Sequence, residues 1–322
     1  MSYSDEMIKF INNLVEDDSL TWEDITFEFN QKFGELKSSN AIRKTFKRSL
    51  EEDEEKEPQK APKVLIFDIE TAPMLAYVWG LWDQNVGLNM IKEEWYVMSF
   101  AAKWLGDPAS KVMYCDQEHI KPQKNDKKLL QEIWDLLDEA DIVITQNGIK
   151  FDQKKLNARF IMQGLKPTSS YRHIDTLRIA KRHFAFTSNK LAYMTDKLCV
   201  KYKKLSHGNF AGFDLWKQCM DHNPKAWEEM KKYNKYDVLS LEELYYALIP
   251  FDNTIDFNVY HEGLGSICKC GSEEFKSAGF FYTSSGKFKK YICKSCGHET
   301  RDKVNLLSKN KKKSLKSQTP KK

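Results

Sequence analysis

Two acidic side chains end an otherwise apolar run near residue 70. The run KVLIFDIE covers residues 63–70, and an apolar run of this length predicts a buried β-strand. Asp68 and Glu70 are two residues apart, so both side chains leave the strand on the same face. Burying two carboxylates is costly unless a positive charge accompanies them, and no basic residue lies between Lys63 and Lys92. Because oxygen ligands favour Mg²⁺ or Mn²⁺, the pair predicts a divalent-metal site; two exposed acids at a strand tip are the alternative.

Two more acids and a tyrosine occupy positions that are equally awkward for packing. Asp152 follows the apolar run DIVITQ (141–146) at the entry to a predicted helix, so it belongs to the same layer of the sheet. Tyr233 precedes Asp237 by four residues in a helical pattern, so both share a face with a row of leucines. Polar groups on a core-facing stripe need polar partners. One cleft that collects all of these groups would supply them.

The motifs FDIET, NGxxFD and YxxxD occur in this order and closely resemble the three motifs of the DEDD superfamily of 3′–5′ exonucleases. The resemblance covers about residues 63–250 and implies an RNase H-like fold. The tyrosine four residues before the last aspartate is typical of the tyrosine branch, which includes the proofreading domains of DNA polymerases and the ribonuclease D-like nucleases. The run VLIFDIETAP also resembles the polymerase-B-like exonucleases of phages and bacteria.

The resemblance implies a role for each of these residues. Asp68, Glu70 and Asp237 would hold the metal that carries the attacking water. Asp68 would bridge to a second Mg²⁺ or Mn²⁺ about 4 Å away, and Asp152 would help mainly through water. Tyr233 would orient the attacking water and help remove its proton, and an ordinary tyrosine pKa near 10 favours positioning over full ionisation.

The implied activity is hydrolysis of nucleic acid to 5′-mononucleotides. DNA is the expected substrate, and a separate DNA polymerase or other replication protein is the expected partner in proofreading or repair. Asn147 and Phe151 belong to the second motif and would position the substrate backbone or its terminal base. Two alternatives stay open: an RNA-processing exonuclease of the ribonuclease D kind, and a non-catalytic adaptor that only binds nucleic acid. Tyr77, Trp79 and Trp82 could stack on unpaired bases or pack into the protein.

Four of the seven cysteines form two glycine-followed pairs separated by 22 residues: Cys268, Cys270, Cys293 and Cys296. The segment between the pairs predicts a β-hairpin, and this arrangement is typical of a zinc ribbon with one structural Zn²⁺. The first pair is CxC and not CxxC, so its turn must differ from the usual knuckle. His261 or His298 could replace one ligand. The hairpin lysines Lys287, Lys289 and Lys290, beside aromatic residues, predict a nucleic-acid-binding face.

The first fifty residues predict three helices. Thr21 is a predicted N-cap, Gly34 ends the second helix, and that helix buries Ile25, Phe27 and Phe29 or part of that set. The third helix carries the basic residues Arg43, Lys44, Lys47 and Arg48. This layout fits a helix-turn-helix module that contacts DNA, and a helical bundle with a solvated basic face fits it as well.

Charge and composition divide the chain into modules. Residues 1–62 carry a net charge of −6, residues 63–262 are neutral, and residues 263–322 carry +11. Strand and helix patterns alternate in the middle part, which predicts an α/β core with a mixed sheet. The predicted modules are a helical module at 1–50, an acidic linker at 51–62, an RNase H-like exonuclease domain at 63–255, a zinc ribbon at 263–303 and a basic disordered tail at 304–322.

The length of 322 residues, with 41% apolar and 30% charged residues, predicts a soluble globular protein of roughly two domains. No run approaches the roughly 18 uncharged apolar residues that a membrane span requires, so we expect no membrane partner. The start MSYSDEMIKF lacks the pattern of a secretion signal. The expected location is therefore the cytoplasm, or the host cytoplasm for a phage protein, where clustered thiols stay reduced and bind metal.

Overall fold

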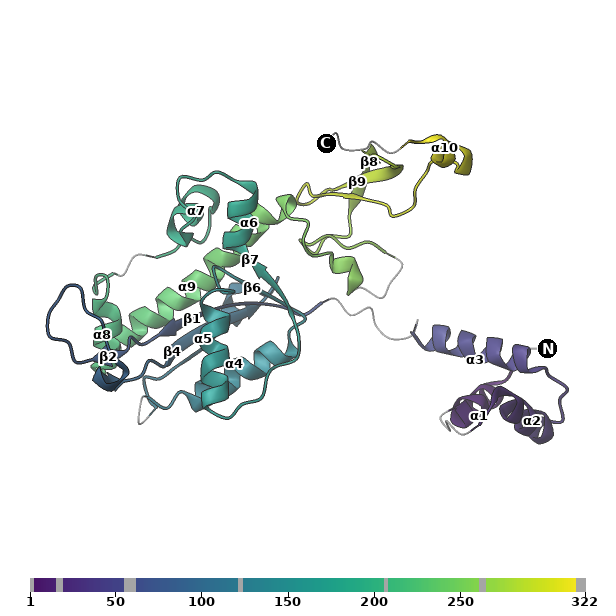
Figure 1. Cartoon of the computed structure of the whole chain (residues 1–322), viewed down its shortest axis with the longest axis horizontal. Helices are drawn as coiled ribbons and strands as arrows, with labels where there is room; N and C mark the ends of the chain where they lie inside the picture. The colour runs from purple at the N-terminus through teal and green to yellow at the C-terminus, as the bar shows by residue number, and fades with distance from the viewer. Residues whose placement is uncertain are drawn as a thin grey trace. The chain divides into compact units, whose positions relative to one another are not determined.

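The computed structural model describes residues 3–15, 20–54, 62–120, 124–205, 208–260 and 265–316 (Figure 1). The chain divides into two compact units, one before residue 61 and one after it. Within the described ranges, no helix combines the length and the apolar character needed to cross a membrane.

Three helices form the N-terminal unit, as predicted: α1 (Asp5–Val15), α2 (Trp22–Phe33) and α3 (Ser39–Glu54). Their apolar faces meet in a small core of Ile11, Ile25, Phe29 and Ile42. Thr21 caps α2 in a capping box, and Gly34 ends it at a φ of 62°, which glycine adopts without strain. Phe27 is 65% exposed, because it follows Ile25 by two positions and so points away from the buried stripe.

Helix α3 continues to Glu54, into the predicted acidic linker, because glutamate is a good helix former. Residues 55–61 of that linker lie outside the described residues.

The second unit contains a five-stranded mixed sheet in the order β5-β4-β1-β6-β7, which confirms the predicted α/β core. Its strands are β1 (Val64–Thr71), β4 (Val97–Trp104), β5 (Met113–Asp116), β6 (Ile142–Thr145) and β7 (Arg172–Asp175). β4 pairs antiparallel with β1 and β5, whereas β6 pairs parallel with β1 and β7. β7 stops at Asp175, because that side chain caps the next helix by accepting from the Leu177 N–H.

Helices cover both faces of this sheet (Figure 1). They are α4 (Lys127–Glu139), α5 (Asp152–Met162), α6 (Thr176–His183), α7 (Leu191–Leu198), α8 (Asp214–Met220) and α9 (Pro224–Leu248). The shorter elements are β2 (Leu75–Ala76), β3 (Ile91–Glu93) and the 3-10 turns η1 (Leu88–Met90), η2 (Ala109–Lys111), η3 (Ile249–Phe251) and η4 (Phe257–Val259).

Alternate residues of β1 face different helices. Leu65, Phe67 and Ile69 belong to the apolar cluster formed with α4 and α5. Val64 and Ile66 belong to the cluster formed with α9. Asp68 and Glu70 continue the second set, so the period of two residues directs both carboxylates to the side of the sheet that α9 covers.

The C-terminal region is a three-stranded sheet followed by a short helix. Its elements are β8 (Phe275–Thr283), β9 (Gly286–Cys293), β10 (Glu299–Arg301) and α10 (Lys309–Ser314). The prediction of disorder is wrong for residues 309–314, because Ser308 caps this turn by accepting from the Lys311 N–H at 3.1 Å. Residues 317–322 lie outside the described residues.

The segment before β8 packs against the end of α9. Ile267 joins the same apolar cluster as α9. The Tyr245 hydroxyl donates to the Lys269 carbonyl at 3.0 Å, and the buried Lys269 ammonium donates to the Asp252 carbonyl at 2.6 Å. The cysteine-rich region is therefore joined to the α/β core by packing and by hydrogen bonds.

A buried ion pair joins the start of α4 to α5. Both carboxylate oxygens of Asp126 accept from the Arg159 guanidinium, at 2.7 and 2.6 Å. The Asp126 side chain makes no capping bond at the start of α4 and accepts the Val97 N–H of β4 at 3.0 Å.

We expect Arg159→Ala to lower the free energy of unfolding by about 3–5 kcal/mol, because it leaves the Asp126 carboxylate buried without its counter-charge. Urea unfolding followed by circular dichroism measures this loss. The control Lys217→Ala removes an exposed pair with Asp221 and should change stability by less than about 0.5 kcal/mol. Equal effects of the two substitutions would contradict the role given to the buried pair.

Candidate active site and metal centre

Three carboxylates converge between β1 and α9. One carboxylate oxygen each of Asp68, Glu70 and Asp237 can be chosen so that all lie within 4.8 Å of one another. Asp237 is 2% exposed, and the other two are half-buried. Among the described residues, none donates a hydrogen bond to Asp237 Oδ1. A buried acceptor without a partner, inside a set of oxygen ligands, fits a bound divalent cation.

The fourth predicted carboxylate lies beside this cluster and not within it. β6 ends at Thr145, whereas β1 continues to Thr71, so this edge of β1 extends beyond its neighbour. The buried Asp152, at the first position of α5, accepts the Ile69 N–H there at 3.3 Å. Burial raises the pKa of Asp152 to about 7.

The negative charges raise one another's proton affinity. Burial and the charge of Asp237 raise the pKa of Glu70 to about 8. Burial, with the charges of Asp237 and Glu70, holds the pKa of Asp68 well above its usual range. The clustered carboxylates therefore either hold protons or bind a cation that offsets their negative charge.

Lys204 supplies a positive charge that sequence analysis missed. Its ammonium forms an ion pair with Asp237 Oδ2 and lies 4.2 Å from the centroid of the Tyr233 ring. Burial opposes the charged form, but the charges of Asp237 and Asp68, the Tyr233 hydroxyl and the hydrogen bond to Asp237 together raise the pKa of Lys204. No pattern in the lysine-rich run 201–204 distinguished this residue, because its position depends on how the segment after α7 folds back.

Asn234 and Trp216 also contact the cluster and were not predicted. The buried Asn234 amide donates to Asp68 Oδ2 at 2.8 Å and accepts from the Ser99 hydroxyl of β4 at 3.1 Å. Trp216 of α8 hydrogen-bonds to Glu70. The sequence carried one signal for Asn234: an amide on the predicted helix, one position after Tyr233 and three positions before Asp237.

Tyr233 is 6% exposed and projects from the same face of α9 as Asp237. Its ring meets the Trp216 ring edge-on, with the centroids 6.0 Å apart. Burial, then the charge of Asp237, raises the pKa of Tyr233 above its usual value. Its hydroxyl therefore stays protonated at neutral pH and can orient a water or a phosphate oxygen by hydrogen bonding.

A cleft beside Lys204 is lined by basic and amide side chains. Lys181, Lys190 and Asn147 line it with Lys204. Asn147 adopts a φ of 66°, which asparagine tolerates, and its N–H donates to Asp175 at 2.9 Å. The positive φ at this position of the second motif therefore favours asparagine for its backbone conformation. Phe151 is 40% exposed just before α5.

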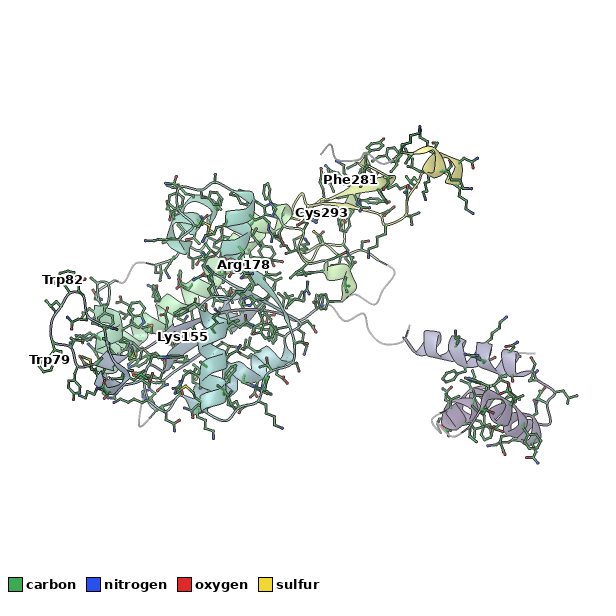
Figure 2. The ribbon with its side chains drawn as sticks, in the orientation of Figure 1. Trp79, Trp82, Lys155, Arg178, Phe281 and Cys293 are labelled. Atoms are coloured by element: carbon green, nitrogen blue, oxygen red, sulfur yellow. The ribbon has the colours of Figure 1, made fainter. Side chains whose placement is uncertain are left out.

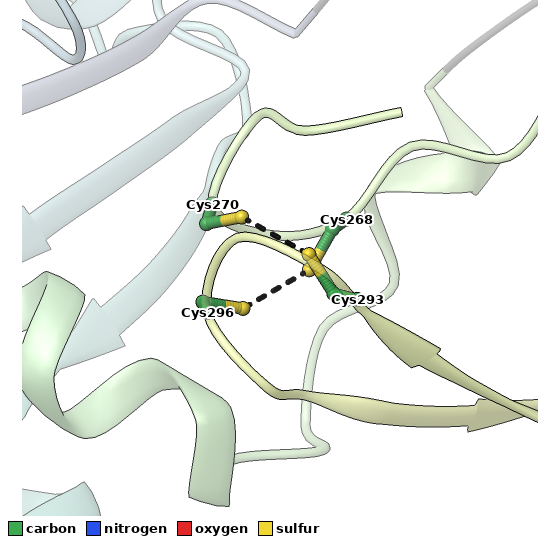
Figure 3. Close-up of side chains that lie close together, drawn as sticks. All are labelled: Cys268, Cys270, Cys293 and Cys296. Atoms are coloured by element: carbon green, nitrogen blue, oxygen red, sulfur yellow. Dashed lines mark hydrogen bonds between the residues drawn. The ribbon is translucent and has the colours of Figure 1, made fainter. Parts of the chain in front are cut away.

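The four cysteines predicted as zinc ligands lie together (Figure 3). Their sulfurs lie within 4.8 Å of one another, with Cys268 to Cys296 at 3.5 Å and Cys270 to Cys293 at 3.7 Å. Burial opposes ionisation of Cys293, but hydrogen bonds from the Cys296 and Ser295 backbone lower its pKa to about 6. Four thiols at this spacing fit a tetrahedral metal ion.

The shorter first pair still closes a turn around its sulfurs. The Gly271 N–H donates to the Cys268 carbonyl at 2.8 Å, and the Gly297 N–H donates to the Cys293 carbonyl at 3.0 Å. Both glycines have positive φ, 85° and 78°. His298 hydrogen-bonds through Nδ1 to the Pro250 carbonyl at 3.0 Å and is not part of the cluster; His261 lies outside the described residues.

The other predicted nucleic-acid contacts are distributed over two elements. Arg43, Lys44 and Lys47 are exposed on α3, and the side chain of Arg48 lies outside the described residues. On β9, Lys287 and Lys289 alternate with Lys290, so the register puts Lys290 on the opposite face, where it pairs with Glu299 at 3.2 Å.

The exposed aromatic residues of the loop after β2 are a separate feature. Tyr77, Trp79 and Trp82 are 66%, 97% and 83% exposed, and the two tryptophans are labelled at the edge of the core in Figure 2. These exposures exclude packing into the core, which was one of the two predictions for the three residues.

Residues 65–249, more than half of the chain, match the family model of the RNase H superfamily. The chain belongs to the RNase H superfamily. This membership confirms the expected fold of the core and supports a nuclease-type hydrolase that uses divalent metal. A family B DNA polymerase from the hyperthermophilic archaeon Pyrobaculum calidifontis is similar in structure, with a TM-score of 0.44 and 16% sequence identity over 59% of this chain and 25% of that chain. No curated protein matches the chain.

The raised acid pKa values predict how pH and Mg²⁺ act on stability. An acid whose folded pKa lies above its unfolded value stabilises the fold at low pH, and this contribution is lost as pH rises from about 4.5 through about 8 for Glu70. We therefore expect Mg²⁺ to raise the unfolding temperature more at pH 8 than at pH 5, where it competes with protons. Differential scanning calorimetry measures both shifts. Equal shifts at the two pH values would contradict metal binding at these carboxylates.

Proposed function

We propose that this protein is a metal-dependent 3′–5′ exonuclease of the DEDD tyrosine branch that hydrolyses DNA to 5′-mononucleotides. The observation that carries the proposal is the convergence of Asp68, Glu70 and Asp237, with Tyr233 and Lys204 beside them. The resemblance of the three motifs supports the 3′–5′ direction and a role in proofreading or repair for a separate polymerase. RNA remains the second substrate to be tested.

Asp68, Glu70 and Asp237 would hold two Mg²⁺ or Mn²⁺ ions, with Asp152 acting from beside the cluster. When bound, such ions activate a water and neutralise charge on the phosphate oxygens. Asn234 would hold the Asp68 carboxylate in position through its 2.8 Å hydrogen bond. The cost of burying these carboxylates supports a cation site here, because only part of their charge is balanced by Lys204.

Tyr233 would donate a hydrogen bond from its hydroxyl to the attacking water or to a phosphate oxygen and so fix the line of attack. Lys204, Lys181 and Lys190 line the adjoining cleft, and their positive charges would attract the phosphates of the strand end. Phe151, exposed at the start of α5, would contact the terminal base.

The four cysteines would bind one structural Zn²⁺ and complete a zinc ribbon over residues 263–303. A set of four thiolates leaves no position for water or substrate, so the ion would stabilise structure only. The exposed basic residues of α3 support a contact between the N-terminal unit and DNA.

We expect Asp68→Asn and Asp237→Asn each to lower the cleavage rate by about 10³-fold, because several kcal/mol of metal-dependent stabilisation is lost. The assay follows 5′-labelled single-stranded DNA, RNA and a mismatched duplex with Mg²⁺. A 3′–5′ enzyme yields a ladder of shortened labelled strands, whereas 5′–3′ hydrolysis releases a labelled mononucleotide at once. The control Asp221→Asn, an exposed acid, should keep the wild-type rate. Rates near wild type in either cluster variant would refute the site.

We expect Tyr233→Phe to slow single-turnover cleavage about 10- to 100-fold while metal binding is kept, because the hydroxyl positions the reacting groups without holding the metal. Isothermal titration with Mn²⁺ checks the second part. An unchanged cleavage rate would remove Tyr233 from the mechanism.

We expect elemental analysis of the purified protein to find about one Zn²⁺ per chain, and Cys293→Ser to abolish it. The same variant should lower the unfolding temperature of the α/β core, because the first cysteine pair flanks Lys269, which is bonded to the end of α9. Cys115→Ser, outside the cluster, is the control for zinc content. Absence of zinc in protein purified without chelator would contradict the zinc ribbon.

A further inference from the structure

The hairpin β8–β9 separates its aromatic side chains onto two faces. Phe280 pairs with Lys289 and Tyr282 pairs with Lys287, and cross-strand partners share a face. We call the surface made by Phe280, Tyr282, Lys287 and Lys289 the Phe280 face. Phe281, labelled in Figure 2, pairs with Phe288 on the opposite face.

The two faces differ in the contacts that their cations and aromatic rings make within the protein. On the opposite face, the Arg301 guanidinium lies 4.1 Å from the Phe288 ring centroid and 5.3 Å from that of Phe281. Lys290 on that face pairs with Glu299. That face is therefore largely occupied by contacts within the protein.

The Phe280 face has two exposed rings, and the Lys287 ammonium covers one side of the Phe280 ring. Phe280 is 46% exposed and Tyr282 is 64% exposed, with their centroids 6.5 Å apart. The Lys287 ammonium lies 3.8 Å from the Phe280 centroid and 5.8 Å from that of Tyr282. Two open rings that a cation flanks offer adjacent stacking surfaces.

The charge around these rings favours a polyanion. Residues 275–298 contain five lysines and no acid. Of the neighbouring acids, Glu274 pairs with Lys294, Glu299 pairs with Lys290, and Asp302 accepts from the Tyr291 hydroxyl at 3.2 Å. Among the described residues, neither Lys287 nor Lys289 forms an ion pair.

We propose that the Phe280 face binds single-stranded nucleic acid, with bases stacked on Phe280 and Tyr282 and phosphates contacting Lys287 and Lys289. Open rings need open base faces, which a duplex buries in its own stack, so unpaired strands fit and duplexes do not. This site rests on the proposed nuclease function, for which it would be a second contact with the substrate strand. Of the three hairpin lysines predicted to bind nucleic acid, the proposed site uses Lys287 and Lys289 and leaves out Lys290, which lies on the other face.

Equilibrium binding of a labelled oligothymidine to the full chain, without added Mg²⁺ so that the strand stays intact, tests the site. We expect Phe280→Ala and Tyr282→Ala each to weaken affinity about tenfold, within the range for one base stacked on one ring. The matched control is Phe281→Ala, of similar exposure on the opposite face, which should stay within about twofold of wild type. Equal losses in all three variants, or no loss in the first two, would overturn the proposal.

The lysines provide a second, independent measurement. Lys287→Ala with Lys289→Ala should reduce the slope of log affinity against log salt by about 1.4, because each single-strand phosphate contact contributes about 0.7. Lys290→Ala should leave the slope unchanged. Equal loss of affinity for a blunt duplex of the same length would indicate phosphate attraction without stacking and would overturn the site.

Cleavage measured beside binding separates this proposal from the nuclease itself. With Phe280→Ala and Tyr282→Ala combined, hydrolysis at saturating strand should match wild type while half-saturation requires more strand. If the wild-type chain hydrolyses nothing, the proposed function fails, and the binding comparison still decides whether the Phe280 face contacts single strands.

Discussion

Helix α9 is the constraint on which the second unit depends. Its 25 residues form one rigid rod, about 37 Å long at 1.5 Å per residue. In its middle, Asn234 and Asp237 meet the acids of β1, and farther along Glu242 accepts from the buried Lys103 of β4 at 2.8 Å. Near its end, Tyr245 holds the backbone of Lys269. A shift of this helix would therefore disturb the carboxylate cluster and the cysteine-rich segment together.

The electrostatics of the cluster explain why it is suited to a cation. Carboxylates that are buried together raise one another's pKa, and Lys204 offsets part of that cost by pairing with Asp237. The remaining negative charge is available to divalent metal. Asn234 and Trp216 orient two of the carboxylates by hydrogen bonds, so the acids are held in place before a metal arrives. Such preorganisation avoids reorganisation at the moment of reaction.

The cysteine cluster joins the ribbon to the core. Lys269 lies between the two cysteines of the CxC pair. Its carbonyl accepts a hydrogen bond from Tyr245 of α9, and its ammonium donates one to the Asp252 carbonyl. A metal held by the cysteines would therefore stabilise this joint as well as the hairpin. Cys293, the last residue of β9, belongs to the cysteine cluster. The cluster therefore fixes one end of the hairpin that carries the exposed rings and lysines of β8 and β9.

Periodicity and local chemistry determined much of this protein. The spacing of two between Asp68 and Glu70 and of four between Tyr233 and Asp237 correctly placed each pair on one face. The alternation of strand and helix patterns predicted an α/β core with a mixed sheet. The two cysteine pairs were likewise predicted to meet, because the predicted hairpin between them returns the second pair to the first. Lys204 and Trp216 could not be found in this way. Their contacts join segments far apart in the chain, and whether Lys290 shares a face with Lys287 depends on the strand register. Only tertiary packing decides such contacts, because local patterns specify which face a side chain leaves by and not what it meets there.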